Sequence, residues 1–433
     1  MKILIVSYYF PPFNAVGAIR AGKMAKYLYQ MGHDVRVISA DNQIWMPNLP
    51  VEIDEKYINR TKWLNINKPI ESLLGGSKNI SKKGFQEAKK LPDFIKTLGY
   101  WYRDFINFPD AQIGWYPFAM KAGKKLLENW KPDFIWASSS PPTSLLVARK
   151  LSKYYQIPWI ADLRDLWADN HNAELYQSKI RRLIDSKLEK WVLKTANALV
   201  TISEPLAEIL RNKFNNPIAV ITNGYDQTDY PKQDVATDQT ILNIVYTGTI
   251  YPKKDDFNSF FEALALLGEE IKKIKIHIYG RGNQNFKKIA AKYGVAEAVQ
   301  CHELISYSES LQHQINADIL LLLIHNSPKE AGSLPAKFFE YLGARKRILL
   351  IGYAEGAAAN IIRMSNRGVV ENSPTKIAEY LIQFLLDKNE GRLNSLTLDS
   401  VGDFTRQKKA EELIQFLTQI KNSNAFNKDV NIQ

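Results

Sequence analysis

Three groups of residues in the second half of the chain could bind an anionic ligand. Each group follows an apolar run that predicts a buried strand, and in doubly wound α/β sheets ligands bind beyond the carboxyl ends of the strands. Helix N-termini at this edge offer free N–H groups and the positive end of a dipole. The candidate residues are Gly248, Thr249, Lys254, Arg281, Gly332, Ser333, Leu334, Lys337 and Glu340.

Together these residues have the chemistry of a nucleoside diphosphate site. Their cations and backbone N–H groups could neutralise a diphosphate, and the carboxylate of Glu340 could accept two hydrogen bonds from a ribose cis-diol. Taken singly, each residue is as typical of solvated surface. The prediction therefore depends on all three groups ending strands of one domain.

A second polar cluster ends a predicted strand in the first half of the chain. It contains Asp162, Arg164 and Asp165, flanked by two tryptophans. Two acids and an arginine in such surroundings are costly to bury unpaired. They form either a structural ion-pair network or a site that polarises an acceptor hydroxyl, and the residues alone leave both open. Ser139 ends another predicted strand and could face the same cleft.

The elements that must position these residues are parallel strands alternating with helices. Apolar runs without polar alternation indicate strands buried on both faces, and helical patterns separate them. The runs form two series, which predict two doubly wound, Rossmann-like α/β units: 3–7, 35–39, 134–138, 159–162 and 198–202, then 218–222, 244–247, 274–279, 319–324 and 348–351. We expect domains at 1–215, with an insertion at about 45–110, and at 216–400, followed by a C-terminal helix and polar tail at 401–433 that pack back on the first domain.

The composition is that of a globular protein in a reducing compartment. The chain has 433 residues, of which 45% are hydrophobic and 24% charged, and its one cysteine, Cys301, cannot form an internal disulfide. A net charge of +12 favours an anionic partner, although an ordinary basic surface is equally consistent with it. No apolar run approaches the roughly 20 residues needed to cross a bilayer, so we expect a soluble or peripheral protein.

Several classes of enzyme are disfavoured because their motifs are missing. The loop after the first predicted strand contains no G-x-G-x-x-G, and the chain contains no P-loop, G-x-S-x-G, H-E-x-x-H or Asp-x-Asp motif. These absences argue against a dinucleotide redox enzyme, a serine hydrolase, a zincin and a transferase with an Asp-x-Asp metal bridge. Basic residues are dispersed and no recognition motif occurs, so we expect no nucleic-acid partner.

In their order along the chain, several segments resemble family 4 glycosyltransferases of the GT-B fold. The segments are residues 1–32 with Gly17 and Arg20, 133–140, 162–167, 200–204, 221–226 and 334–342. Residues 108–115 resemble a subgroup that builds bacterial surface polysaccharides. The resemblance implies retaining transfer of a sugar from a nucleotide-diphosphate donor held by the second domain to an acceptor held by the first, with no cofactor and no obligatory metal.

The resemblance also implies roles for individual residues. Glu340 would bind the ribose, Lys254 and Arg281 the diphosphate, and the backbone of 332–334 would assist. The residues implied to shape the acceptor side and the cleft are Gly17, Arg20, Ser139, Asn223 and Gly224, and the catalytic candidates are Asp162, Arg164 and Asp165. This chain departs from the family pattern at Thr249, where an arginine is common, and at Arg164, where many members have histidine.

These observations predict a cytoplasmic glycosyltransferase that adds a sugar to a glycan or lipid-linked acceptor in polysaccharide biosynthesis. Lysines and aromatic residues within 51–110 suggest contact with an anionic membrane at its inner face, and a surface insertion with its own small core explains them as well. Two alternatives remain: a nucleotide-sugar epimerase of the same fold, and a non-catalytic protein that binds nucleotide sugars or glycans.

Overall fold

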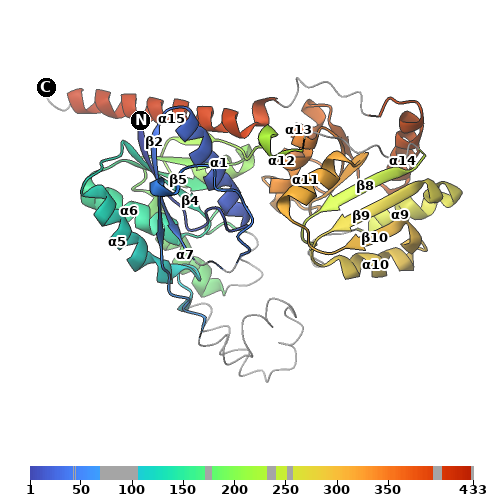
Figure 1. Ribbon diagram of the computed structural model, residues 1–433, viewed down its shortest axis with the longest axis horizontal. Helices are drawn as coiled ribbons and strands as arrows, with labels where there is room; N and C mark the ends of the chain where they lie inside the picture. The colour runs from blue at the N-terminus through green and yellow to red at the C-terminus, as the bar shows by residue number, and fades with distance from the viewer. Residues whose placement is uncertain are drawn as a thin grey trace. The chain divides into compact units, whose positions relative to one another are not determined.

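The computed structural model describes residues 1–41, 43, 45–68, 106–170, 178–231, 240–250, 257–393 and 402–430. The chain forms two compact units (Figure 1), Met1–Thr201 with Leu206–Val220 and Ile414–Gln433, and Ile202–Pro205 with Ile221–Leu413. Each unit contains one wholly parallel sheet with interleaved helices. The predicted class, two doubly wound α/β units, is confirmed.

The sheet of the first unit has seven strands in the order β3-β2-β1-β4-β5-β6-β7. The strands are β1 (Lys2–Val6), β2 (Asp34–Ala40), β3 (Ile58–Thr61), β4 (Phe134–Ser139), β5 (Trp159–Leu163), β6 (Ala198–Thr201) and β7 (Ile218–Val220). Every residue of β4 and β5 is buried, as expected for continuous apolar runs covered on both faces. The strand order reverses between β1 and β4, and such a reversal is where doubly wound sheets bind ligands.

The helices of the first unit connect these strands. Within the described residues they are α1 (Val16–Gln30), α5 (Tyr116–Leu127), α6 (Thr143–Tyr155), α7 (Lys179–Leu193) and α8 (Glu204–Arg211). Helix α15 (Arg406–Val430) begins in the second unit and from Ile414 onwards belongs to the first, where Lys421 forms a salt bridge of 2.8 Å with Asp133. The helix reaches Val430, so it extends into the polar segment that the sequence predicted as a tail.

The segment at 108–115 anchors helix α6. The carboxylate of Asp110 accepts hydrogen bonds from the backbone N–H of Thr143, at 2.6 Å, and from its hydroxyl, at 2.8 Å. The backbone carbonyl of Pro109 accepts a hydrogen bond of 2.6 Å from the Arg181 guanidinium. Burial raises the pKa of Asp110 to about 6, while its hydrogen bonds from Thr143 oppose the shift. In this structure the motif therefore joins α6 to α7.

The sheet of the second unit has six strands in the order β10-β9-β8-β11-β12-β13. Its strands are β8 (Leu242–Thr247), β9 (Ile274–Tyr279), β10 (Val299–His302), β11 (Ile319–Leu323), β12 (Arg347–Ile351) and β13 (Gly368–Val370). The helices are α9 (Asn258–Leu266), α10 (Asn283–Lys292), α11 (Tyr307–Ile315), α12 (Ala336–Ala344), α13 (Ala357–Met364) and α14 (Pro374–Asn389). Here the order reverses between β8 and β11.

One predicted strand belongs to the other sheet. The run at 218–222 was assigned to the second series, but β7 pairs with β6 in the first sheet, with Leu199 opposite Ile218. All three residues of β7 are only half-buried, so it is an edge strand, and an apolar run does not show which sheet edge it will join. The short strands β3, β10 and β13 were not predicted.

Among the described residues, no helix is long and apolar enough to cross a bilayer.

Candidate functional site

Two glycine-containing loops meet at the carboxyl ends of β8 and β9. Gly248 follows β8 with φ of +120°, and its N–H donates to the carbonyl of Tyr279 at 2.8 Å. Gly280 follows β9 with φ of +138°, and a Cβ at Gly280 would lie 2.2 Å from the carbonyl oxygen of Gly248. Only glycine adopts this backbone without strain and permits this approach. The partly exposed backbone of Gly248 therefore lies at the switch point of the sheet, packed against the buried backbone of Gly280.

Helix α12 brings a cation to this backbone. The Nζ atom of Lys337, in the first turn of α12, lies 3.8 Å from the ring centroid of Tyr246, which is a cation–π distance. A Cβ added to Gly248 would be 2.8 Å from the same Nζ atom. The ammonium group thus lies over the end of β8. It is only partly buried and can contact a bound anion.

Glu340, one turn further along α12, is held in a hydrogen-bond network. Its Oε2 atom accepts from the side-chain amide of Gln314 at 3.0 Å, and the same amide donates to the Thr247 hydroxyl oxygen at 3.0 Å. The Thr247 N–H donates to the hydroxyl of Tyr341 at 3.1 Å. Burial raises the pKa of Glu340, although Gln314 and the nearby Lys337 oppose the shift. A carboxylate fixed in this way is suited to accept hydrogen bonds from ligand hydroxyls.

Three other predicted residues of this group lie in loops after β9 and before α12. Arg281 is exposed after β9, and Ser333 is half-buried before α12. Leu334 is 5% exposed, so its side chain packs inside the unit rather than facing a ligand. Lys254 lies outside the described residues, and the structure does not place it. Sequence reasoning missed Gln314, which comes from α11 and carries no motif.

In the first unit, Asp162 is committed to an internal ion pair. Its Oδ1 atom is 2.7 Å from Nη2 of Arg20, its Oδ2 atom is 2.9 Å from Nε, and Oδ2 also accepts from Ser138 Oγ at 3.0 Å. The side chains of Arg20 and Asp162 are 2% and 0% exposed. Of the two interpretations that the sequence left open for this acid, the geometry agrees with the structural ion pair. The pair joins α1 to β5.

Arg164 organises the loops at the switch point of the first sheet. Its Nε donates to the carbonyl of Ser139 at 3.0 Å, and its Nη2 donates to the carbonyl of Ser140 at 3.0 Å. A Cβ on Gly17 would lie 2.9 Å from Nη2, so a side chain at this position would displace the guanidinium. Asp165 is exposed beside the group. Of the three catalytic candidates, Asp165 is the one whose carboxylate is open to solvent.

Asn223 and Gly224 pack against the segment that precedes α15. The Asn223 side-chain oxygen accepts from Nη1 of Arg406 at 3.2 Å. A Cβ on Gly224 would be 2.5 Å from the carbonyl oxygen of Phe404, and the following N–H, of Tyr225, donates to that carbonyl at 2.9 Å. Both residues thus have a packing role within the second unit.

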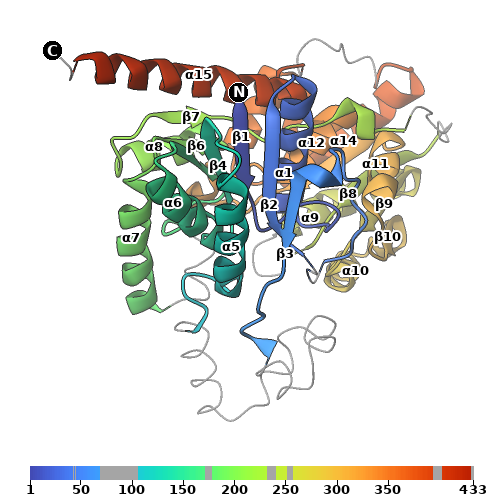
Figure 2. The same ribbon diagram turned by 60° about the vertical axis from the view of Figure 1, so that its left-hand side comes forward.

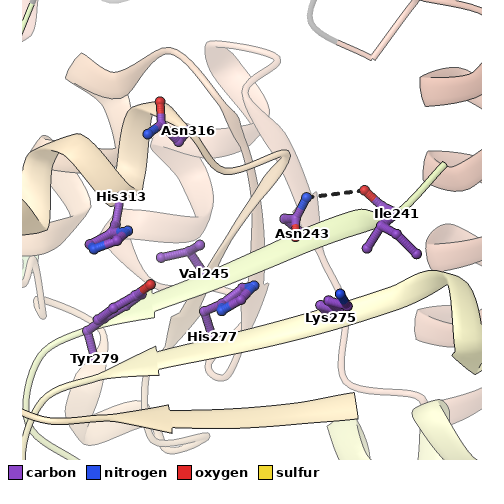
Figure 3. Close-up of a pocket in the computed structure, with 8 residues that line it drawn as sticks. All are labelled: Ile241, Asn243, Val245, Lys275, His277, Tyr279, His313 and Asn316. Carbon is purple, nitrogen blue, oxygen red and sulfur yellow. Dashed lines mark hydrogen bonds between the residues drawn. The ribbon is translucent and has the colours of Figure 1, made fainter. Parts of the chain in front are cut away.

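A cavity of about 270 Å³ lies on the face of the second sheet, beside α11 (Figure 3). It is lined by Ile241, Asn243, Val245, Lys275, His277, Tyr279, His313 and Asn316. Tyr279 stacks on His313, with ring centroids 4.1 Å apart, and on His302 at 4.3 Å. Burial lowers the pKa of His277 to about 4. None of the lining residues was predicted, because they come from three separate elements.

Known families and structures match this chain along most of its length. Residues 82–229 match Glycosyltransferase Family 4, and residues 229–397 match Glycosyl transferases group 1. Curated protein sequences give no significant match.

Among solved structures, the chain is similar to sucrose-phosphate synthase from Thermosynechococcus elongatus, with a TM-score of 0.65, 12% identity and coverage of 98% of this chain and 100% of that one. It is also similar to HepE from Anabaena in complex with UDP and glucose (TM-score 0.61, 13% identity, 97% and 100% coverage). A third similar structure is WaaG, a glycosyltransferase involved in lipopolysaccharide biosynthesis (TM-score 0.57, 15% identity, coverage of 95% of this chain and 99% of that one).

The family matches and the fold together define the class of protein. The two matches follow one another and span residues 82–397, and the structural similarities extend over both units. The chain belongs to the glycosyltransferases of the GT-B fold, with a family 4 match followed by a group 1 match. It is a glycosyltransferase, as the sequence predicted.

Proposed function

We propose that this enzyme transfers a sugar, with retention at the anomeric carbon, from a nucleotide-diphosphate sugar to a glycan or lipid-linked acceptor in polysaccharide biosynthesis. The observation that carries the proposal is the position of Lys337 beside the Gly248 backbone, at the reversal of strand order in the second sheet, with Glu340 linked through Gln314 to Thr247. A cation and a fixed carboxylate separated by one helical turn match the diphosphate and ribose of one ligand.

In this proposal the second unit stabilises the leaving diphosphate. As the bond to the sugar breaks, the diphosphate gains negative charge and the sugar becomes oxocarbenium-like. The Lys337 ammonium, the Arg281 guanidinium and the positive end of the α12 dipole act more strongly on that charge than on the ground state. Glu340 orients the nucleotide through its ribose. These groups belong to the protein, so we propose that no metal is obligatory.

The first unit supplies the acceptor side. Asp165 is the exposed carboxylate that can accept a hydrogen bond from an acceptor hydroxyl. Arg164 fixes the loops that carry Gly17 and Ser139, and the buried pair of Arg20 and Asp162 holds α1 against β5. Asp165 is thus proposed to contact the acceptor, and Arg164, Arg20 and Asp162 to position the groups around it.

The donor and acceptor classes draw support from similar proteins. The HepE structure is a complex with UDP and glucose. WaaG is described as a glycosyltransferase involved in lipopolysaccharide biosynthesis. By analogy, we propose that this enzyme uses a nucleotide-sugar donor and a glycan or lipid-linked acceptor. We also propose that it acts in the cytoplasm, peripherally bound at the inner membrane face. The lysine-rich and aromatic residues that suggested the membrane lie mostly within 69–105, outside the described residues. No nucleic-acid partner is proposed.

A product assay tests this function. The enzyme is incubated with UDP-, GDP-, ADP- and dTDP-sugars, with and without lipid-linked oligosaccharide acceptors, and the product linkage is read by NMR. Transfer with retained anomeric configuration, in the presence of EDTA, supports the proposal. Conversion of the donor without any acceptor indicates an epimerase instead, and binding without transfer or donor hydrolysis indicates a non-catalytic role.

A further inference from the structure

Helix α7 exposes an apolar stripe to solvent. Ile180 and Leu183 are each 60% exposed, Trp191 is 54% exposed and Ile184 is 38% exposed. Positions 180, 184 and 191 fall on one line along a helix of 3.6 residues per turn, and 183 is adjacent to it. A surface helix usually places polar residues on its solvent face. The stripe is therefore unusual for a face that contacts only water.

The charges on α7 are sorted between its two faces. Its two acids point inward: Asp185 is 2% exposed and pairs with Arg181 at 2.8 Å, and Glu189 is fully buried. The exposed charged residues of the helix are all lysines, at 179, 187 and 190, and Lys194 follows directly after the last turn. Lys187 lies within the apolar stripe itself. The outward face of α7 is thus apolar and purely cationic.

The neighbouring helices extend this surface. Figures 1 and 2 both show α5, α6 and α7 together beside the seven-stranded sheet, and α6 packs against α5 and α7. The sequences of α5 and α6 contain no acidic residue. The exposed residues on them are Pro117, Phe118, Lys121, Lys124, Lys125, Lys150, Lys153 and Tyr154. The Arg149 guanidinium carbon lies 3.3 Å from the ring centroid of Trp191 and joins the two helices.

We propose that this surface, formed by α5, α6 and α7, docks onto an anionic lipid bilayer. The stripe of Ile180, Leu183, Ile184 and Trp191 inserts at the boundary between head groups and acyl chains, and the lysines contact anionic head groups. A lysine within the stripe argues for lipid rather than a protein partner, since protein interfaces are depleted of lysine at their cores. This inference rests on the peripheral placement in the proposed function but not on its sugar chemistry.

Vesicle binding tests the proposal in the absence of any nucleotide sugar. The full-length protein is sedimented with vesicles of phosphatidylcholine alone and of phosphatidylcholine mixed with phosphatidylserine, at low and high salt. We expect binding to the anionic vesicles that salt weakens. Each charge near such a surface contributes about fivefold in partitioning, so Lys187→Gln with Lys190→Gln should reduce binding by about 25-fold. Ile180→Ser with Ile184→Ser should also reduce binding by at least tenfold.

A matched control removes the same charge elsewhere. Lys288→Gln with Lys292→Gln alters two exposed lysines on α10 of the second unit and should leave binding within about threefold of wild type. Thermal unfolding of every variant checks that the fold is intact. No vesicle binding by the wild type, or equal losses in the α7 and α10 variants, overturns the proposal. A dimer that Ile180→Ser with Ile184→Ser dissociates, without vesicle binding, also overturns it. Donor hydrolysis, assayed without vesicles, reports separately on the sugar chemistry.

Discussion

The substitution Asp162→Asn should strongly destabilise the first unit, whereas Asp165→Asn should not. Asp162 accepts contacts of 2.7 and 2.9 Å from Arg20 and 3.0 Å from Ser138, and both members of the ion pair are buried. An amide in its place leaves the guanidinium buried without a counter-charge, which costs about 3–5 kcal/mol. The Asp165 side chain is exposed, and surface changes usually stay within about 0.5 kcal/mol.

The loss can be measured by calorimetry and urea unfolding. For a unit of this size about 2–4 °C is lost per kcal/mol, so the unfolding transition of the first unit should fall by roughly 6–20 °C in Asp162→Asn. The pair Arg20→Met with Asp162→Leu should recover part of the loss, because neither charge remains buried alone. If the free energy of unfolding of Asp162→Asn stays within about 1 kcal/mol of the wild-type value, the carboxylate is not committed to Arg20. A direct contact of Asp162 with the acceptor would then be the better interpretation.

Three further predictions concern the second unit. Lys337→Gln should raise the Kd for a nucleoside diphosphate by about 10–150-fold in isothermal titration calorimetry, since a charge-assisted contact is worth about 1.5–3 kcal/mol; an unchanged Kd contradicts the assigned role. Burial raises the pKa of Glu340 above 4.5. As the pH rises through the folded-state pKa, the contribution of Glu340 to the free energy of unfolding should therefore fall, whereas the affinity for the donor should rise. Glu340→Gln should flatten both the stability–pH and the affinity–pH profiles. The pKa of His277 is lowered from 6.5 to about 4, so stability should fall as pH drops through that window, and fall less in His277→Gln; equal slopes in urea unfolding contradict this.

Much of the fold could be predicted because buried parallel strands leave continuous apolar runs. The run at 134–138 became β4, and that at 319–324 became β11. The strands missed or misassigned lie at or near sheet edges: β3, β10 and β13 are short, and β7 joined the first sheet. An edge strand buries only part of its surface, so its sequence carries a weaker apolar pattern and does not specify its neighbour.

The candidate site was predictable only where chemistry follows a strand directly. Lys337 and Glu340 could be placed because their helix comes soon after a buried strand. Gln314, which fixes Glu340, could not, because it comes from another helix and contacts the site only through the tertiary fold. The same limit applies to Asp162: its residue type suggested pairing, but its partner Arg20 is 142 positions away.

The most direct test of the donor site is the thermal stability of the wild type and Glu340→Ala against UDP-, GDP-, ADP- and dTDP-sugars. A ligand at 100 times its Kd stabilises the folded protein by about 2.7 kcal/mol. We predict that one nucleotide class raises the unfolding temperature of the wild type and that Glu340→Ala removes the shift. No shift with any nucleotide sugar, or an equal shift in Glu340→Ala, would contradict the assignment of the donor site to α12 and the end of β8.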